Sequence, residues 1–220
     1  MARQRFRRKD LKRPDEFVTR GRAYLDWAPN NLQTLMWVGG GFLVVIVIVA
    51  GFFSLRTARV RQANEDLGQA LTGFQAGRYA EAAGQLAAVA ERWQSTPVGR
   101  IAALYAAQAE VNANNVDAAN TRLHDVIAAE QAPYLRQQAF VDLGFVLEQK
   151  ADMAGAAEQY AQAAAMDGPY TATALLGEAR CREQAGEKDK ARTLYERFVQ
   201  QFSQAPEIEV VQTKIAALKS

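Results

Sequence analysis

The 220-residue chain is 49% hydrophobic and carries a nearly balanced net charge of +2. One cysteine and one histidine exclude an intrachain disulfide and a thiolate metal cluster. The small net charge conceals an asymmetry: residues 1–34 carry nine Lys/Arg and four Asp/Glu, whereas residues 56–220 carry 17 and 20. The second region is long enough for one domain with a substantial hydrophobic core.

The N-terminal segment is strongly basic, with seven Lys/Arg between Arg3 and Arg13. Such a block is typical of a solvated tail, and next to a membrane it attracts anionic lipid headgroups. Nucleic acid is the alternative phosphate partner, but we do not expect it, because anionic lipid is the simpler one. Apolar residues recur on one helical face between Pro14 and Trp27, which predicts a short interfacial helix. Residues 1–34 are therefore assigned to a basic arm.

An uninterrupted apolar segment follows, from Leu35 to Leu55, with no charged residue in 21 positions. A helix of this length reaches about 30 Å, the thickness of the hydrocarbon core of a bilayer. A buried β-strand is the alternative, because the centre of the segment is β-branched. A strand of this length without alternation of polar and apolar residues is unusual. The segment is therefore predicted to be a transmembrane helix.

The distribution of basic residues predicts the orientation of this helix. Positively charged residues next to a span stay in the cytoplasm, and those of the arm outnumber Arg56, Arg59 and Arg61 on the other side. A secretory signal peptide is the alternative, but its basic region would be too long and no small-x-small cleavage site precedes Arg56. We predict an uncleaved anchor with a cytoplasmic N-terminus and with residues 56–220 outside the cytoplasm.

The remainder of the chain contains four similar segments. They begin at Gly77, Asn114, Ala151 and Gly186. They share alanines at Ala82, Ala119, Ala156 and Ala191, spaced by 37, 37 and 35 residues. Larger side chains follow four residues later, at Leu86, Leu123, Tyr160 and Tyr195, and a third position follows three residues after these. Spacings of four and seven residues place all three positions on one face of a helix.

The residues before each segment predict a partner helix. Small residues lie seven positions before three of the segments, at Ala107, Gly144 and Ala179. Small residues on both helices let their backbones approach closely, and the larger side chains fill the groove between pairs. A proline follows each second helix and is predicted to end it, at Pro97, Pro133, Pro169 and Pro206. Residues 56–206 are thus predicted to form four helix pairs, and residues 207–220 a closing helix.

This order of small residue, turn, alanine, aromatic residue and proline resembles the tetratricopeptide repeat. The third segment carries the pattern most fully, in Leu143, Gly144, Leu147, Ala156, Tyr160, Ala163 and Gly168-Pro169. The repeat period exceeds the usual 34 residues, so the turns between repeats are expected to be longer. The resemblance implies an all-α solenoid of stacked helix pairs, which follows the single N-terminal transmembrane helix predicted from the apolar segment.

The layout from about residue 33 onward, including the closing sequence PEIEVVQTKIAAL, is similar to the YfgM family, an ancillary subunit of the bacterial SecYEG translocon. The Arg-rich start and the RPDEF stretch depart from that family. The resemblance implies a bacterial inner-membrane protein whose periplasmic repeat domain docks partners at the Sec protein-export machinery. Sec translocon subunits and a periplasmic chaperone are the partners that it implies.

Few residues indicate a catalytic, cofactor or metal site. His124 and Cys181 lie far apart in the sequence without an Asn or Asp pattern, and no phosphate-binding glycine loop occurs. We expect His124 to lie on the surface and Cys181 to be a small buried apolar residue. The sequence therefore predicts no enzyme, and no catalytic, cofactor or metal site.

A binding surface is the remaining expectation. In a tetratricopeptide fold the first helix of each pair lines a concave face, so the resemblance implies a groove there. Register assigns to it Leu104, Gln108, Val111, Gln138, Val141, Phe145, Leu176 and Arg180. An apolar strip edged by amides suits an extended or helical peptide. The alternative is that Leu104, Val141 and Phe145 pack between neighbouring pairs.

Two other functions are compatible with the same features. The protein could be a structural scaffold of another envelope complex, in cell division or secretion. It could also be a regulator that acts through its basic cytoplasmic arm.

Overall fold

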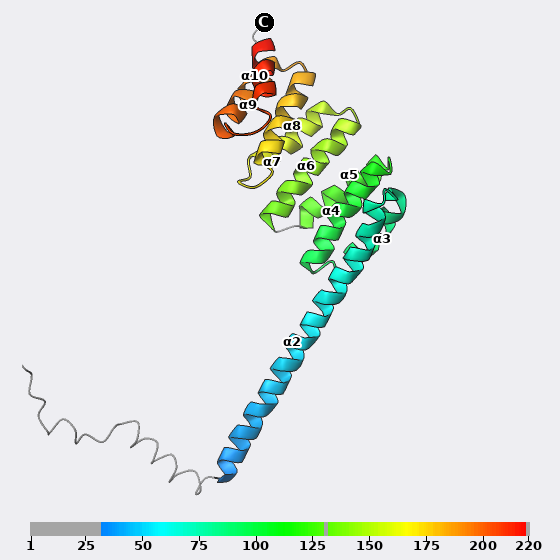
Figure 1. Ribbon diagram of the computed structural model, residues 1–220, viewed down its shortest axis with the longest axis vertical. Helices are drawn as coiled ribbons and strands as arrows, with labels where there is room; N and C mark the ends of the chain where they lie inside the picture. The colour runs from blue at the N-terminus through cyan, green and yellow to red at the C-terminus, as the bar shows by residue number, and fades with distance from the viewer. Residues whose placement is uncertain (1–31, 130–131, 219–220) are drawn as a thin grey trace, which may run out of the picture. The chain divides into compact units, whose positions relative to one another are not determined.

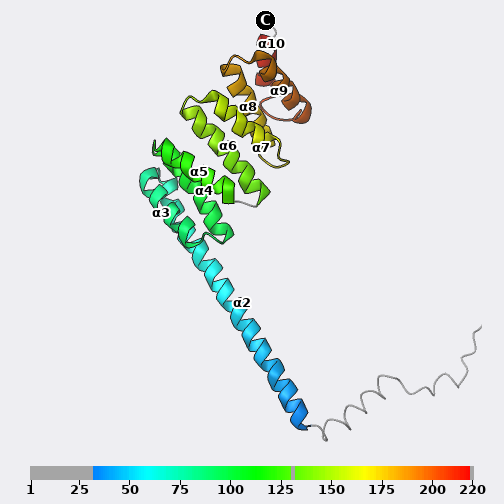
Figure 2. The ribbon, with the colours of Figure 1, turned by 180° about the vertical axis from the view of Figure 1, so that it is seen from behind.

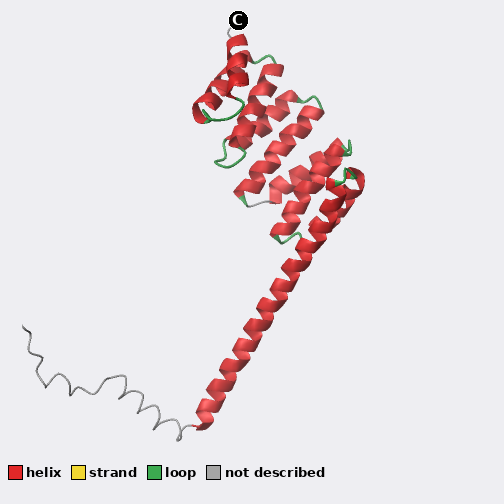
Figure 3. Cartoon of the chain, in the orientation of Figure 1, coloured by secondary structure: helices red, strands yellow, loops and turns green. Residues whose placement is uncertain are grey.

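The computed structural model describes residues 32–129 and 132–218. All regular elements in these ranges are α-helices, and the ranges contain no β-strand (Figures 1 and 3). The predicted all-α fold class is therefore confirmed. The predicted interfacial helix and the basic block of the arm lie outside the described residues. The chain divides into two compact units, Met1–Arg59 and Val60–Ser220.

The first described helix, α2 (Leu32–Gln75), contains the whole of the predicted span, Leu35 to Leu55. From Met36 onward it is long and apolar enough to cross a membrane. The large apolar side chains between Met36 and Leu55 are exposed, as expected of side chains that face lipid. The helix continues past Leu55 because neither a proline nor a left-handed residue interrupts it before Gly77. Its last residues, from Val60, belong to the second unit and serve there as the first helix of the first pair.

The other helices of the second unit follow one another as antiparallel neighbours joined by short turns (Figure 1). They are α3 (Tyr79–Arg92), α4 (Pro97–Asn112), α5 (Val116–Ala129), α6 (Pro133–Gln149), α7 (Met153–Ala164), α8 (Thr171–Gln184), α9 (Lys188–Gln201) and α10 (Ile208–Ala217). The pairs are α2 with α3, α4 with α5, α6 with α7, and α8 with α9.

The turn inside each pair has the same backbone geometry. Its central residue adopts a positive φ, at Gly77 (75°), Asn114 (62°), Ala151 (60°) and Gly186 (80°). These are the first residues of the four segments that align in the sequence. Glycine adopts this conformation without strain and asparagine tolerates it, whereas the Cβ of Ala151 makes the third turn the strained one.

The prolines have a different role from the one predicted. The second helices of the pairs end four or five residues before Pro97, Pro133, Pro169 and Pro206. Pro97 and Pro133 are instead the first residues of α4 and α6, where a missing N–H group needs no partner. Thr96 caps α4 by accepting a hydrogen bond from the Gly99 N–H group at 3.2 Å. Prolines therefore start the following helix at two of the four sites.

The alanines shared by the four segments lie where paired helices touch. Ala82, Ala119, Ala156 and Ala191 are all completely buried. The larger side chains four residues later are buried as well, and they fill the space between successive pairs. Close backbone approach and filled grooves explain why an alanine-rich sequence forms a packed core.

The aromatic ring of Tyr160 on α7 is buried between two glycines of neighbouring helices. Its ring lies against Gly144 of α6 and Gly177 of α8, where an added Cβ atom would be 2.8 Å from ring carbons. Its hydroxyl donates a 2.6 Å hydrogen bond to Glu148, which also accepts two bonds from the Arg180 guanidinium at 2.6 and 3.1 Å. The third and fourth pairs are thus joined by a ring between two glycines and by a shared carboxylate.

The last pair repeats this arrangement with the terminal helix. Tyr195 donates a 2.8 Å hydrogen bond to Glu183, which also accepts one from Lys214 of α10 at 2.7 Å. Val211 of α10 is buried in the same cluster as Tyr195 and Phe198. Helix α10 therefore covers apolar surface that the fourth pair would otherwise expose.

The first helices of the pairs form one row of the stack and the second helices form another, and neighbouring helices lie closer together in the first row. Helix α6 contacts both α4 and α8, whereas, within the described ranges, α5 contacts neither α3 nor α7, and α9 does not contact α7. The first helices of the pairs therefore form the closer row, which we call the inner row. Figure 2 shows the stack of helix pairs from behind. The predicted groove residues all belong to this row.

Candidate partner-binding surface

A small pocket opens between α4 and α6 in the inner row, with a volume of about 80 Å³. Three of the predicted groove residues line it: Gln108, Val111 and Phe145. Phe145 leaves 46% of its surface exposed, which is unusual for a phenylalanine of a folded domain. Position 145 thus combines an exposed aromatic ring with an adjacent hollow.

The remaining predicted groove residues have other surroundings. Leu104 is 2% exposed within the core cluster of the second pair, so it packs between helices and is not available to a partner. Val141 and Leu176 are half-buried against the apolar cluster around α8 and α9. Gln138 accepts a 3.1 Å hydrogen bond from the Tyr170 hydroxyl. The guanidinium of Arg180 is held by Glu148.

The pocket also contains Asp142, which the sequence analysis did not select. Its carboxylate accepts a 3.2 Å hydrogen bond from the side-chain amide of Gln108 across the α4–α6 contact. Burial raises its pKa from 3.8 to about 6, and the Gln108 hydrogen bond opposes this only in part. One signal in the sequence could have identified it: Asp142 is the single charged residue between Phe140 and Leu147.

The raised pKa gives Asp142 a measurable effect on stability. Because the pKa of this carboxyl is raised in the folded state, its ionised form destabilises the fold relative to its neutral form. Folding is therefore most favoured below the unfolded pKa of 3.8, and this advantage is lost as the pH rises through about 6. The variant Asp142→Asn keeps an acceptor for Gln108 without the charge. At pH 7.5 we expect it to be about 2 kcal/mol more stable than the wild type, and near pH 4 equally stable. Urea unfolding followed by circular dichroism at both pH values measures the difference.

The loop between α7 and α8 is fixed by a buried amide of α6. Gln137 is 1% exposed. Its Nε2 donates to the carbonyl oxygens of Ala163 and Met166 and to the Thr171 hydroxyl, each at 3.1 Å. Its Oε1 accepts from the Tyr170 N–H group at 3.2 Å. This network places Tyr170, and hence its bond to Gln138, at the edge of the inner row.

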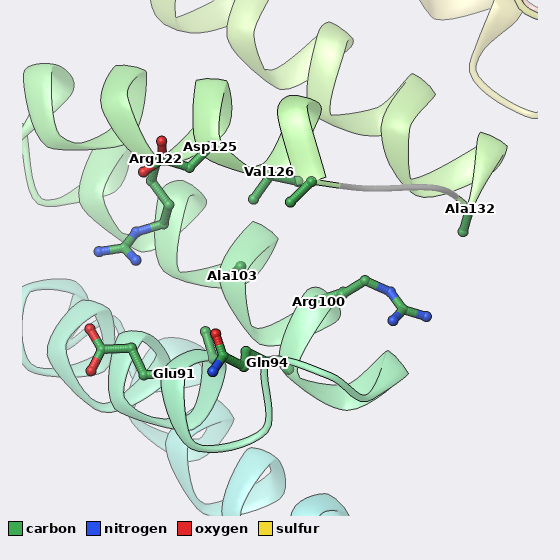
Figure 4. A pocket seen from close by; sticks show the side chains of 11 residues that line it. Glu91, Gln94, Arg100, Ala103, Arg122, Asp125, Val126 and Ala132 are labelled. Atoms are coloured by element: carbon green, nitrogen blue, oxygen red, sulfur yellow. The ribbon is translucent and has the colours of Figure 1, made fainter.

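A larger pocket of about 680 Å³ lies on the other side of the stack, between α3, α4 and α5 (Figure 4). Two acidic residues, Glu91 and Asp125, and two basic residues, Arg100 and Arg122, line it, so its charges are balanced (Figure 4). Arg122 is already held by Glu110 at 2.6 Å. The absence of contact between α3 and α5 explains this opening. The balanced charges of its lining do not favour a ligand of either charge.

The two residues considered for chemistry lie where we predicted. His124 is exposed on α5, and Cys181 is completely buried with Ala156, Ala157 and Tyr160. Burial is the main cause that raises the pKa of the Cys181 thiol, so the reactive thiolate is disfavoured. Across the described helices and turns, no three His, Cys, Asp or Glu residues are grouped to hold a metal ion.

Solved structures with similar folds include repeat proteins. Tetratricopeptide-like repeats of a kinesin light chain protein from Podosopora anserina are 18% identical, with a TM-score of 0.59 over 71% of this chain and 85% of theirs. The MamA protein is 17% identical, with a TM-score of 0.58 over 71% and 80%. A tetratricopeptide repeat protein from Parabacteroides merdae is 9% identical, with a TM-score of 0.60 over 71% and 60%. No curated protein matches the sequence.

Stacked helix pairs with an inner surface define the chain as an α-solenoid, a class of protein that typically serves as a non-enzymatic interaction scaffold. The tetratricopeptide repeat-like domain family matches residues 26–220. The chain belongs to this family. Its membership suggests a protein–protein interaction module, which agrees with the surface between α4 and α6.

Proposed function

We propose that the protein is a membrane-anchored docking module that binds a segment of a partner protein along the inner row of α4, α6 and α8. The exposed Phe145 beside its pocket carries this proposal. Aromatic side chains that stay exposed next to a hollow are typical of sites that a partner covers. The neighbouring Gln108 and Val111 supply a polar and an apolar contact for an extended or helical peptide.

The proposed setting is the bacterial inner membrane, with α2 as the span, the N-terminus in the cytoplasm and the repeat domain in the periplasm. The exposed apolar residues between Met36 and Leu55 support the anchor. The excess of basic residues in the arm supports the orientation. We further propose that anionic lipid binds Arg3 to Arg13 at the cytoplasmic surface.

A protease added to intact spheroplasts tests this topology. The repeat domain should be digested while an epitope placed at the N-terminus is spared. Protection of the domain, with loss of the N-terminal epitope, would reverse the orientation and remove the periplasmic setting.

The partners that we propose are Sec translocon subunits and a periplasmic chaperone, on the basis of the similarity in layout to the YfgM family. Affinity purification after gentle detergent extraction distinguishes this role from the alternatives. Co-purifying translocon subunits favour export. Division or secretion proteins favour an envelope scaffold, and cytoplasmic proteins favour a regulator that acts through the arm.

The variant Phe145→Ala tests whether the inner row binds these partners. We expect recovery of the partner to fall about tenfold, as for an aromatic residue at the centre of an interface. Stability should fall by only about 1 kcal/mol, because about half of the side chain is already exposed. Quantitative mass spectrometry of the purified complex and a thermal melt measure the two effects.

Tyr134→Ala is the matched control, because Tyr134 is an equally exposed aromatic residue (52%) at the other end of α6. It should leave recovery of the partner unchanged. Equal losses of partner recovery for the two variants would show that the partner does not bind specifically at position 145 of α6. A large loss of stability in Phe145→Ala would assign the ring to the core.

A further inference from the structure

Asp142 differs from the other shielded carboxylates of the inner row. Glu110, Glu148, Glu178 and Glu183 are buried or half-buried on α4, α6 and α8, and each has a Lys or Arg nitrogen within 4.0 Å. Asp142 is half-buried as well, but among the described residues its side-chain partner is the neutral amide of Gln108. A shielded carboxylate without a cation is costly unless something else supplies one.

The pocket around this carboxylate is lined by both apolar and polar side chains. Its walls are apolar, from Val111, Leu123, Phe145 and Val146. Its polar groups are those of Gln108, Asn112 and Asp142. A volume of about 80 Å³ exceeds that of a single water molecule in the liquid, about 30 Å³, and suits the end of one side chain.

Lysine and arginine match this combination of walls and charge. Both have an apolar stem that packs along hydrophobic surface and a cationic end that seeks an anion. The exposed ring of Phe145 adds a face on which a cation is favourable. A neutral apolar side chain would bury the Asp142 carboxylate without giving it a cationic partner, and an acidic side chain would be repelled by it.

We propose that the pocket between α4 and α6 accepts one lysine or arginine side chain of the docked partner, with its stem against Val111 and Phe145 and its cation on Asp142. This inference rests on the proposed function and specifies the chemistry of the partner. It assigns Asp142 the role of selecting for a basic residue.

The affinity should therefore depend on pH. The cation binds the ionised carboxylate, so binding should weaken as the pH falls below about 6, where burial has placed the pKa of Asp142. Tyr170, which precedes α8, is the titratable group whose charge couples to Asp142, and burial is the main cause that raises the pKa of its hydroxyl. Tyr170 therefore stays neutral between pH 5 and 8, so Asp142 is the group that changes charge in this range.

The test uses the full-length chain in phosphatidylcholine nanodiscs and a phage library of random 12-residue peptides. The strongest selected peptide is synthesised with its basic residue intact or replaced by norleucine, which keeps the apolar stem and removes the charge. Fluorescence anisotropy measures the affinity of both peptides for the wild type, Asp142→Asn, Phe145→Ala and Glu158→Gln. Glu158 is an exposed carboxylate of α7, so Glu158→Gln controls for net charge.

We expect Asp142→Asn and norleucine each to weaken binding about tenfold or more. The two changes together should weaken binding no more than either change alone, and Glu158→Gln should change the affinity little. Binding should weaken from pH 7.5 to pH 5 for the wild type and stay level for Asp142→Asn.

Two other results overturn the inference and are distinguishable. Peptides that need Phe145 but bind equally well without a basic residue and to Asp142→Asn would leave the proposed function standing and remove the lysine or arginine. Peptides that need neither Phe145 nor Asp142, or the failure to select any peptide, would count against both.

Discussion

Replacing Gly144 by valine should destabilise the repeat domain by about 3 kcal/mol. Even a Cβ at this position would lie 2.8 Å from the Tyr160 ring, closer than packed carbon atoms approach. The ring cannot move away, because it is 3% exposed, has Gly177 on its other side, and is held by Glu148 at its hydroxyl. Thermal and urea unfolding of the full-length protein in mild detergent measure the loss.

Two controls separate this packing effect from helix propensity. Gly84 lies on the exposed side of α3 with nothing within 4 Å of an added Cβ, so Gly84→Ala should raise stability by up to about 1 kcal/mol. Gly144→Val should cost much less when Tyr160→Ala has already removed the ring. Full additivity of these two changes would show that Gly144 and Tyr160 do not share a contact.

Replacing Gln137 by leucine should cost about 3 kcal/mol. Leucine is similar in size but neither donates to the carbonyl oxygens of Ala163 and Met166 nor accepts from the Tyr170 N–H group. Shielded backbone groups that lose their partner pay the full cost of desolvation. The loop before α8 should loosen, which hydrogen exchange of the Tyr170 amide would detect.

Gln149→Leu is the matched change, because Gln149 is exposed near the end of the same helix. It should alter stability by less than about 0.5 kcal/mol. If Gln137→Leu were equally harmless, the α7–α8 loop would be held by something other than this amide.

Helix periodicity explains why the architecture could be predicted. Four alanines recur with large residues four positions later, at Ala82, Ala119, Ala156 and Ala191. Such spacing places both on one face of a helix, and a stack of helix pairs buries that face. The exact role of the turns was less visible. Ala151 occupies a left-handed turn that sequence alone would assign to glycine, because the repeat geometry overrides the preference of one residue.

Contacts between distant residues could not be predicted in the same way. Gly177, which faces Tyr160 as Gly144 does, has no repeat pattern that marks it. Gln137 and Gln138 are adjacent and identical in the sequence, yet one is buried in a network and the other lies half-exposed at the groove. The same limit applies to the candidate site: Phe145 and Gln108 were selected by register, whereas Asp142 depends on how α4 and α6 meet.

Photo-crosslinking in intact membranes tests the central claim most directly. A benzoylphenylalanine probe replaces Phe145 in the pocket, or Tyr134 at the other end of α6, in the full-length chain. Docking on the inner row predicts a discrete adduct with another protein from position 145 and little or none from position 134. Equal crosslinking from both positions, or adducts from position 145 only with a second copy of this chain, would contradict it.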